Sequence, residues 1–366
     1  MKVINISNFF AEFGGAFIEQ LIILNEELIK QGNESILIFP EEARYTKWAK
    51  NLSEKYRVYF VSLINKKNKQ KVINELKEIF EIENPDIIHS HFDGYDIPIT
   101  KAAREDVIKI YHRHNEFDLS NLCLYKKIYA SINLKVNMRY LRKKGYSIFN
   151  SNDMLKSFLN RNYVLENRAL IVMNGISTKR LDKKYDISNN YTKPIILSFI
   201  GNWYRKGGDI LFKAIEQINK ENIKVYLASI VSQEFIIKNI GYLPKWFIPL
   251  EVTDDVGKYY SMVDIFVSSS RKETFSYALA EAIYSKLKCI SSDIDGVQWA
   301  KEIPSVKFFK ITNIEELVEK IEGTLIENYD EEVYDKSQKI IKEKYSEYVW
   351  VQNIINVYKD ISGTSY

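Results

Sequence analysis

Residues 264–294 read DIFVSSSRKETFSYALAEAIYSKLKCISSDI and contain the pattern that decides the fold. Two strand-like runs, at 264–270 and 288–294, flank a segment that predicts a helix from about Phe275 to Lys286. A strand, a helix and a second strand in this order form the unit that builds parallel sheets covered by helices. This stretch therefore predicts an α/β protein.

The same alternation of strand-like and helix-like segments extends through most of the 366 residues. The strand-like runs before residue 177 are 2–7, 34–39, 56–63, 86–92, 107–114, 146–151 and 169–175. After residue 193 they are 195–203, 223–230, 246–252, 264–270, 288–294 and 305–311. Because the chain is about twice the common domain size, we expect two doubly wound domains with a cleft between them.

Composition excludes several classes of protein. A hydrophobic fraction of 46% is ordinary for a globular chain, and the distant Cys123 and Cys289 form neither a disulfide scaffold nor a zinc cluster. No leader peptide or membrane-spanning run is evident, so we expect a cytoplasmic protein. Residues 1–180 hold 28 Lys+Arg against 21 Asp+Glu, a net +7, so the remainder carries −3 of the total +4. A general nucleic-acid binder would carry a denser basic stripe.

Two glutamates make 264–294 a candidate site. Glu273 precedes the expected helix and Glu281 lies within it. Between them the backbone N–H groups of Phe275, Ser276 and Tyr277 occupy a helix amino terminus, which binds anions. Carboxylates accept hydrogen bonds from hydroxyls, so the two glutamates suit a sugar and a ribose. The helix amino terminus between them suits a diphosphate. The alternative is that Glu273 caps the helix and Glu281 makes a surface ion pair.

The segment ETFSYALAEA is similar to the E-x(7)-E element of retaining glycosyltransferases of family 4 (glycosyl transferases group 1), of capsule and exopolysaccharide type. The resemblance implies the GT-B fold, with two Rossmann-like domains facing a cleft. Glu273 would bind donor-sugar hydroxyls and take part in catalysis, and Glu281 would bind the ribose. Residues 1–176 would bind the acceptor, 177–193 would be a linker, and 194–345 would bind the nucleotide sugar. A helix in 346–366 would pack back on the first domain.

Two further segments fit this resemblance. Gly14 and Gly15 follow the first strand, where the family's glycine pair lets backbone N–H groups approach the donor phosphate; the alternative is a plain turn. Arg205 and Lys206, in FIGNWYRKGGD, are similar to the family's basic phosphate loop and would neutralise the diphosphate in place of a metal. Their alternative is a solvated basic turn.

All four histidines lie at the ends of two expected strands: His89, His91, His112 and His114. The run HRHN resembles the H-x-H-N segment of capsule and exopolysaccharide transferases. That resemblance implies a catalytic His114 beside the donor sugar ring and His91 facing the acceptor, with the other two in the core. Zinc is the alternative, but no carboxylate or thiol spacing supports a metal site.

The chain also departs from the family pattern. Asn202 stands where the family has arginine, the run LASIVSQEF lacks a G-x-G turn, and SKLKC lacks G-x-P, so base recognition is open. Asp293 and Asp295 spell D-x-D, the metal motif of another glycosyltransferase fold, but after the E-x(7)-E helix we interpret them as a loop.

These features predict a retaining hexosyltransferase that moves a sugar from a UDP- or GDP-linked donor to a hydroxyl of a glycan or glycolipid, in cell-surface polysaccharide synthesis. The donor is a co-substrate, and neither a cofactor nor a metal is expected. The alternatives are a non-catalytic GT-B partner subunit that binds glycan or another transferase, and a nucleotide-sugar epimerase or phosphorylase on a similar fold.

An anionic membrane surface is a further expected partner, at the inner face of the cell membrane. One basic cluster lies within 66–71 and another within 135–144. Leu134, Met138 and Leu141 would form an apolar helical stripe beside the second cluster, suited to a lipid surface. The alternative is that this stripe packs on its own domain.

Overall fold

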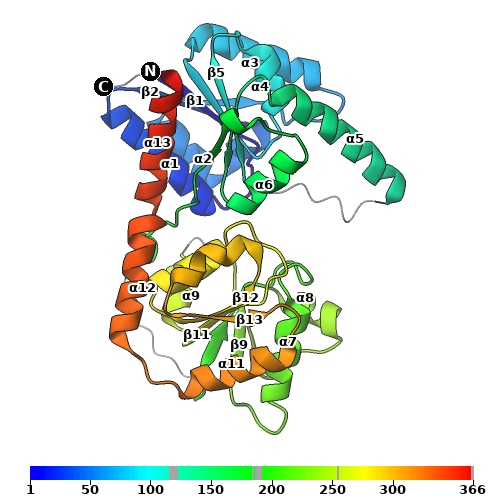
Figure 1. Ribbon diagram of the computed structural model, residues 1–366, viewed down its shortest axis with the longest axis vertical. Coiled ribbons are helices and arrows are strands. Elements are labelled where there is room, and N and C mark those ends of the chain that lie inside the picture. Colours follow the sequence, from blue (N-terminus) through cyan, green and yellow to red (C-terminus); the bar gives the residue numbers. More distant parts are fainter. Residues whose placement is uncertain (115–122, 184, 186–191, 254, 364–366) are drawn as a thin grey trace. The chain divides into compact units, whose positions relative to one another are not determined.

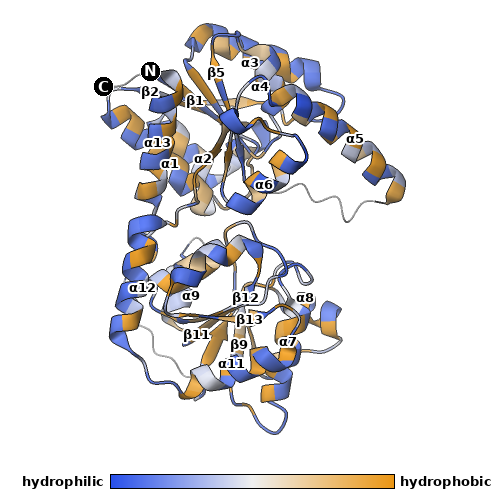
Figure 2. Cartoon of the chain, viewed as in Figure 1, coloured by the Kyte–Doolittle hydropathy of each residue, from blue (hydrophilic) through white to orange (hydrophobic). Residues whose placement is uncertain are grey.

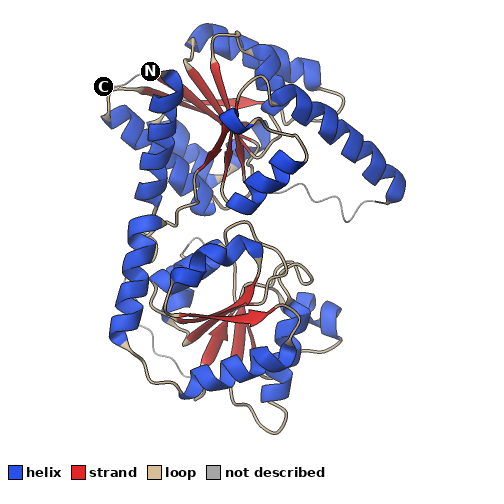
Figure 3. Cartoon of the chain, viewed as in Figure 1, coloured by secondary structure: helices blue, strands red, loops and turns tan. Residues whose placement is uncertain are grey.

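The computed structural model describes residues 1–114, 123–183, 185, 192–253 and 255–363. The chain divides into two compact units, Met1–Met173 with Trp350–Tyr366, and Asn174–Val349 (Figure 1). Part of the expected linker, residues 184 and 186–191, lies outside the described residues. Each unit is a parallel sheet covered by helices (Figure 3). The predicted α/β class with two doubly wound sheets is confirmed.

In the described part of the first unit, seven parallel strands follow the order β3-β2-β1-β4-β5-β6-β7. The strands are β1 Lys2–Ser7, β2 Glu34–Pro40, β3 Val58–Val61, β4 Ile87–His91, β5 Ile108–Arg113, β6 Tyr146–Phe149 and β7 Ala169–Ile171. Most of their side chains are buried on both faces. The continuous apolar run Ile36–Phe39 in β2 is the sequence consequence of such double coverage.

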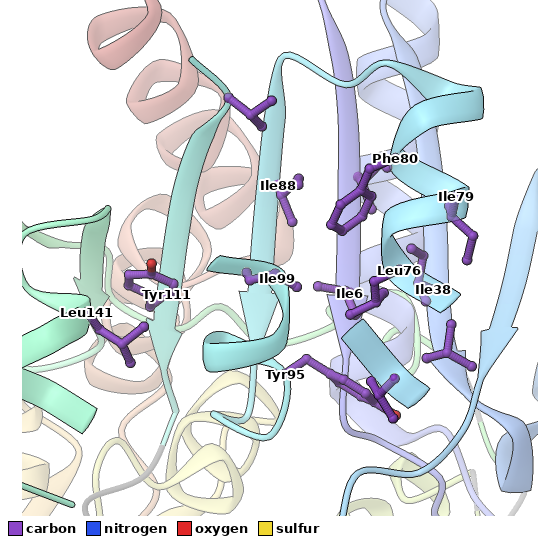
Figure 4. Packing of buried hydrophobic residues seen from close by; sticks show 14 of the residues in the cluster. Ile6, Ile38, Leu76, Ile79, Phe80, Ile88, Tyr95, Ile99, Tyr111 and Leu141 are labelled. Atoms are coloured by element: carbon purple, nitrogen blue, oxygen red, sulfur yellow. The ribbon is translucent and has the colours of Figure 1, made fainter. Parts of the chain in front are cut away.

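Helices cover both faces of this sheet. One face packs against α3 (Lys69–Glu83), α4 (Asp96–Ala102), α5 (Leu124–Leu141) and α6 (Asn152–Asn160). Figure 4 shows the part of this cluster that α3, α4 and α5 form with the strands. The other face packs against α1 (Gly15–Lys30), α2 (Lys47–Lys55) and α13 (Glu347–Ser362). Trp350, Ile354 and Tyr358 of α13 are buried in the core of this unit.

The second unit has, over its described residues, six parallel strands in the order β10-β9-β8-β11-β12-β13. They are β8 Ile195–Leu197, β9 Tyr226–Ser229, β10 Phe247–Pro249, β11 Ile265–Ser268, β12 Lys288–Asp293 and β13 Val306–Lys310. Its helices are α7 Gly208–Ile218, α8 Gln233–Ile240, α9 Gly257–Ser261, α10 Tyr277–Tyr284, α11 Ile314–Ile326 and α12 Glu331–Lys344. Helices α7, α8 and α11 share one buried cluster on this sheet.

Strand register places polar side chains at the carboxyl ends of the first sheet. Ser7 pairs with His91, and His91 pairs with His112, so these side chains share one face. The expected strand-helix-strand segment is also present, as β11, α10 and β12. Among the described helices, none has the length and apolar composition needed to cross a membrane.

Candidate functional site

The turn between β8 and α7 carries the two predicted cations, Arg205 and Lys206. It is tied to the loop after β11, because the Ser269 hydroxyl donates to the carbonyls of Lys206 at 2.9 Å and Gly207 at 3.0 Å. Gly207 has a φ of 66°, and a Cβ there would lie 1.9 Å from the Ser269 carbonyl oxygen. Only glycine therefore allows this turn to sit so close to the neighbouring loop.

The loop after β11 places Glu273 against these cations. Lys206 Nζ donates to Glu273 Oε1, Arg205 Nη1 lies 3.5 Å from Oε2, and the Ser270 hydroxyl donates to Oε1 at 2.8 Å. The Glu273 side chain is only 9% exposed, whereas that of Arg205 is 44% exposed. The structure thus brings three predicted residues into contact, and Glu273 does not act merely as a helix cap.

Helix α10 begins directly after this loop, and Ser276 is its N-cap residue with a φ of 65°. A left-handed conformation is costly for a residue other than glycine and is typical of functional sites. The Phe275 side chain is buried and stacks on Trp299, with ring centroids 4.9 Å apart. Phe275 can therefore offer a ligand only its backbone, and the carbonyl of that backbone accepts from the Trp299 indole N–H at 2.7 Å.

Glu281 lies in the interior of α10 and is 5% exposed. The buried Tyr260 hydroxyl donates to Glu281 Oε2 at 2.8 Å, and Arg180 Nη2 lies 3.5 Å from Oε1. Burial, and then the Glu281 carboxylate, raise the pKa of Tyr260 well above its usual value, so this phenol stays a donor. The surface ion pair considered above is therefore wrong, because the carboxylate is held inside the unit.

Arg180 was missed by sequence reasoning because it falls in the segment expected to be a linker. Its neighbours attach that segment to the second unit: Thr178 donates to Glu347 Oε1 at 3.0 Å, and the Tyr284 hydroxyl donates to Asp182 at 2.7 Å. No local pattern marks Arg180, since its partner is 101 positions away (281 − 180).

Asp293 and Asp295 lie at the end of β12 and in the turn after it. Asp293 accepts from Gln298 at 2.7 Å and lies 3.0 Å from Lys301 Nζ. Hydrogen bonds from Lys301 and Gln298 lower the pKa of Asp293. These local contacts fit the interpretation of this D-x-D as a loop.

In the first unit, Gly14 is the N-cap residue of α1 and Gly15 has a φ of 56°. A Cβ on Gly15 would meet no atom within 4 Å, so its backbone borders open space. This arrangement leaves room for a ligand beside the first turn of α1.

The four histidines form one buried cluster on β4, β5 and the residue after β5. Adjacent ring centroids lie 4.1–5.4 Å apart, with His112 stacked on His114 at 4.2 Å and His89 near His91 at 4.1 Å. His91 Nδ1 lies 3.0 Å from His114 Nε2. His91, expected to face an acceptor, is completely buried, and His114 is 8% exposed.

Hydrogen bonds around the cluster favour particular tautomers. Asn5 Oδ1 accepts from Tyr358 at 3.4 Å and lies 3.3 Å from His91 Nε2, so His91 carries its proton there and its Nδ1 accepts from His114. Burial lowers the pKa of all four imidazoles, to about 3 for His114. The cluster is therefore neutral at physiological pH.

Among the described residues, His89, His91 and His112 are the group whose ring nitrogens lie close enough, within 4.8 Å of one another, to suggest a metal site. Both ring nitrogens of His91 already have partners. The buried Arg113 lies in the same strand as His112 and acts against added positive charge. Without a carboxylate to balance a dication, these residues fit a neutral hydrogen-bonded cluster better than a metal centre.

A comparison with known protein families finds a match within the second unit. Residues 194–328 match the model of the family Glycosyl transferases group 1. The matched range contains Arg205, Lys206, Glu273 and Glu281, and stops before α12. No curated protein sequence matches the chain.

Solved structures resemble the chain over its whole length. A glycosyltransferase from Rickettsia africae is 18% identical with a TM-score of 0.77, covering 100% of this chain and 99% of that chain. Anabaena HepE in complex with UDP and glucose is 14% identical (TM-score 0.76; 98% and 99% covered). Sucrose-phosphate synthase from Thermosynechococcus elongatus is 13% identical (TM-score 0.77; 100% of both chains). At these identities the likeness establishes the GT-B fold.

Proposed function

We propose that the chain is a retaining glycosyltransferase that moves a hexose from a UDP- or GDP-linked donor to a hydroxyl of a glycan or glycolipid, in cell-surface polysaccharide synthesis. The family match and the GT-B fold support a nucleotide-sugar glycosyltransferase. One observation carries the proposal: Glu273 contacts Arg205 and Lys206 directly before the amino terminus of α10, and Glu281 is buried inside that helix.

This arrangement suits a nucleotide diphosphate linked to a sugar. Lys206 has three N–H donors, so its bond to Glu273 leaves two for phosphate oxygens. The half-exposed Arg205 and the first turn of α10 add further donors for an anion. A carboxylate offers about four lone-pair sites, so Glu281 can accept ribose hydroxyls in addition to its bond from Tyr260.

In the proposed reaction, the acceptor oxygen bonds to the anomeric carbon as the bond from that carbon to the leaving phosphate oxygen breaks. The acceptor proton passes to the leaving phosphate on the same face, which retains the anomeric configuration. Arg205 and Lys206 stabilise the charge that develops on the diphosphate, which is the role of a metal in other transferases. His114 would lie beside the sugar ring as a neutral imidazole whose Nε2–H donates to His91, and no metal or cofactor is required.

Donor hydrolysis and binding by the purified chain test the proposal. UDP, GDP and their sugars are added separately in a thermal-shift screen, where a ligand at about 100 times its Kd stabilises the fold by about 2.7 kcal/mol. We expect one base to shift the Tm and the matching sugar nucleotide to be slowly hydrolysed. Stabilisation without hydrolysis or transfer would favour the non-catalytic partner subunit, and isomerised donor would favour the epimerase.

A further inference from the structure

Helix α5 has two apolar faces. Met138 and Leu141 are buried in the core of the first unit, and Leu134 packs against them. The stripe of Leu134, Met138 and Leu141 therefore packs on its own domain. The prediction that this stripe binds a lipid surface is wrong.

The opposite side of α5 is also apolar, and it is exposed. Seven of the exposed large hydrophobic side chains lie on this helix, from 38% to 80% exposed: Leu124, Tyr125, Ile128, Tyr129, Ile132, Val136 and Tyr140. At about 100° per residue they fall within an arc of about 160°, centred opposite the buried stripe. Figure 2 shows hydrophobic and hydrophilic residues side by side along α5. A contiguous apolar patch of this kind marks an interaction surface.

Along α5 and the three residues after it, the charged side chains are positive. Residues 124–144 contain seven Lys and Arg and no Asp or Glu. Lys135 and Arg139 project from within the apolar arc at about 100° per residue. Lys66, from the loop before α3, lies over the Tyr129 ring at 5.2 Å, so the fold adds one member of the 66–71 basic cluster to the same surface.

We propose that the exposed face of α5, with Lys66 beside it, docks the chain on an anionic lipid bilayer. Apolar and tyrosine side chains would enter the boundary between headgroups and acyl chains, while the cations contact lipid phosphates. A second copy of the chain fits this face less well, because pairing two such surfaces would bring like charges together. The inference is independent of catalysis, so failure of donor binding would leave it intact.

Co-sedimentation of the full chain with vesicles tests the proposal. Wild-type protein should pellet with phosphatidylcholine–phosphatidylglycerol vesicles at low salt, less at high salt, and not with phosphatidylcholine alone. Removing three cations should lower the apparent affinity roughly 100-fold; the variant is Lys126→Gln/Lys135→Gln/Arg139→Gln. Removing three apolar groups should lower it at least about tenfold; that variant is Tyr125→Gln/Ile128→Gln/Ile132→Gln.

Matched controls change the same chemistry on other exposed surfaces of the first unit. They are Lys50→Gln/Lys55→Gln/Lys77→Gln and Ile29→Gln/Tyr45→Gln/Ile82→Gln, at exposed positions of α1, α2, α3 and the turn before α2. Both controls should bind as wild type, and all variants should keep the wild-type thermal transition. The proposal would be overturned if a variant and its control lost the same vesicle affinity, or if the wild-type protein bound neutral and anionic vesicles equally. It would also be overturned by a dimer in solution that the apolar variant abolishes.

Discussion

At the scale of single residues, Glu281 is the predicted site residue that is held most firmly by its neighbours. Its carboxylate is held by Tyr260 and Arg180 and is 5% exposed. We expect Glu281→Gln to weaken nucleotide affinity about 10- to 150-fold, because a hydrogen bond to a charged group contributes about 1.5–3 kcal/mol. Isothermal titration with UDP and GDP measures this change.

Glu273→Gln is the matched control for that variant. It removes the charge beside Arg205 and Lys206 but leaves the proposed ribose contact in place, so turnover should fall more than nucleotide affinity. Thermal unfolding checks that Glu281→Gln, which leaves Arg180 without its carboxylate, is still folded. If the folded Glu281 variant bound nucleotide as tightly as wild type, the ribose assignment would be wrong.

The histidine cluster makes a prediction about pH. His112 is buried, neither ring nitrogen has a hydrogen-bond partner, and burial lowers its pKa well below 6.5. A histidine with a lowered pKa stabilises the fold above its unfolded-state pKa, and this contribution is lost as the pH falls below about 6.5. Each such histidine costs about 1.4 kcal/mol per pH unit well below 6.5. The free energy of unfolding should therefore decline steeply between about pH 6.5 and pH 4.

His112→Phe should remove one of these titrating groups. Its free energy of unfolding at pH 7.5 should change by less than about 3 kcal/mol, the cost of modest overpacking, and its slope below pH 6.5 should be shallower by about 1.4 kcal/mol per pH unit. Ile148→Val, on the same face of the sheet, should lower stability without changing the slope. An unchanged slope in the His112 variant would show that this ring is not buried in its neutral form.

At the scale of elements, the turn between β8 and α7 depends on its contact with the loop after β11. Gly207→Ala combines a positive φ with a Cβ 1.9 Å from the Ser269 carbonyl oxygen. Gly241→Ala is the control. Gly241 ends α8 with a φ of 89°, and a Cβ there would meet no atom within 4 Å. This variant therefore measures only the cost of a positive φ for alanine, about 1–2 kcal/mol. Chemical denaturation should show a clearly larger loss for Gly207→Ala, with weaker nucleotide binding. Equal losses would argue against the close contact.

At the scale of the whole molecule, the reaction should proceed without a metal ion. In the proposed reaction the cations of the β8–α7 turn would take the place of a metal at the diphosphate, and Asp293 is engaged by Lys301 and Gln298. Donor hydrolysis by the full chain should survive EDTA, and elemental analysis of the purified protein should find no stoichiometric zinc or manganese. Activity lost in EDTA and restored by manganese would return Asp293 and Asp295 to consideration as ligands.

Local patterns were enough to predict both sheets and the segment that carries Glu273 and Glu281. Apolar runs, helical spacing and the glycines at turns depend on neighbouring residues, and so does the amino terminus of α10, which follows β11 after a short loop. For this reason the strand-like runs of the sequence correspond to the strands of both sheets. The resemblance of FIGNWYRKGGD to a basic phosphate loop likewise indicated Arg205 and Lys206.

Other features depended on the tertiary structure, because they join residues far apart in the chain. Lys206 and Glu273, which are in contact, are 67 positions apart. Arg180, which contacts Glu281, lies in a segment whose composition indicated only a linker. Strand register made the four histidines one buried cluster. Packing also decided which apolar stripe of α5 is covered, since two opposite stripes are equally apolar in sequence and only the sheet can bury one of them.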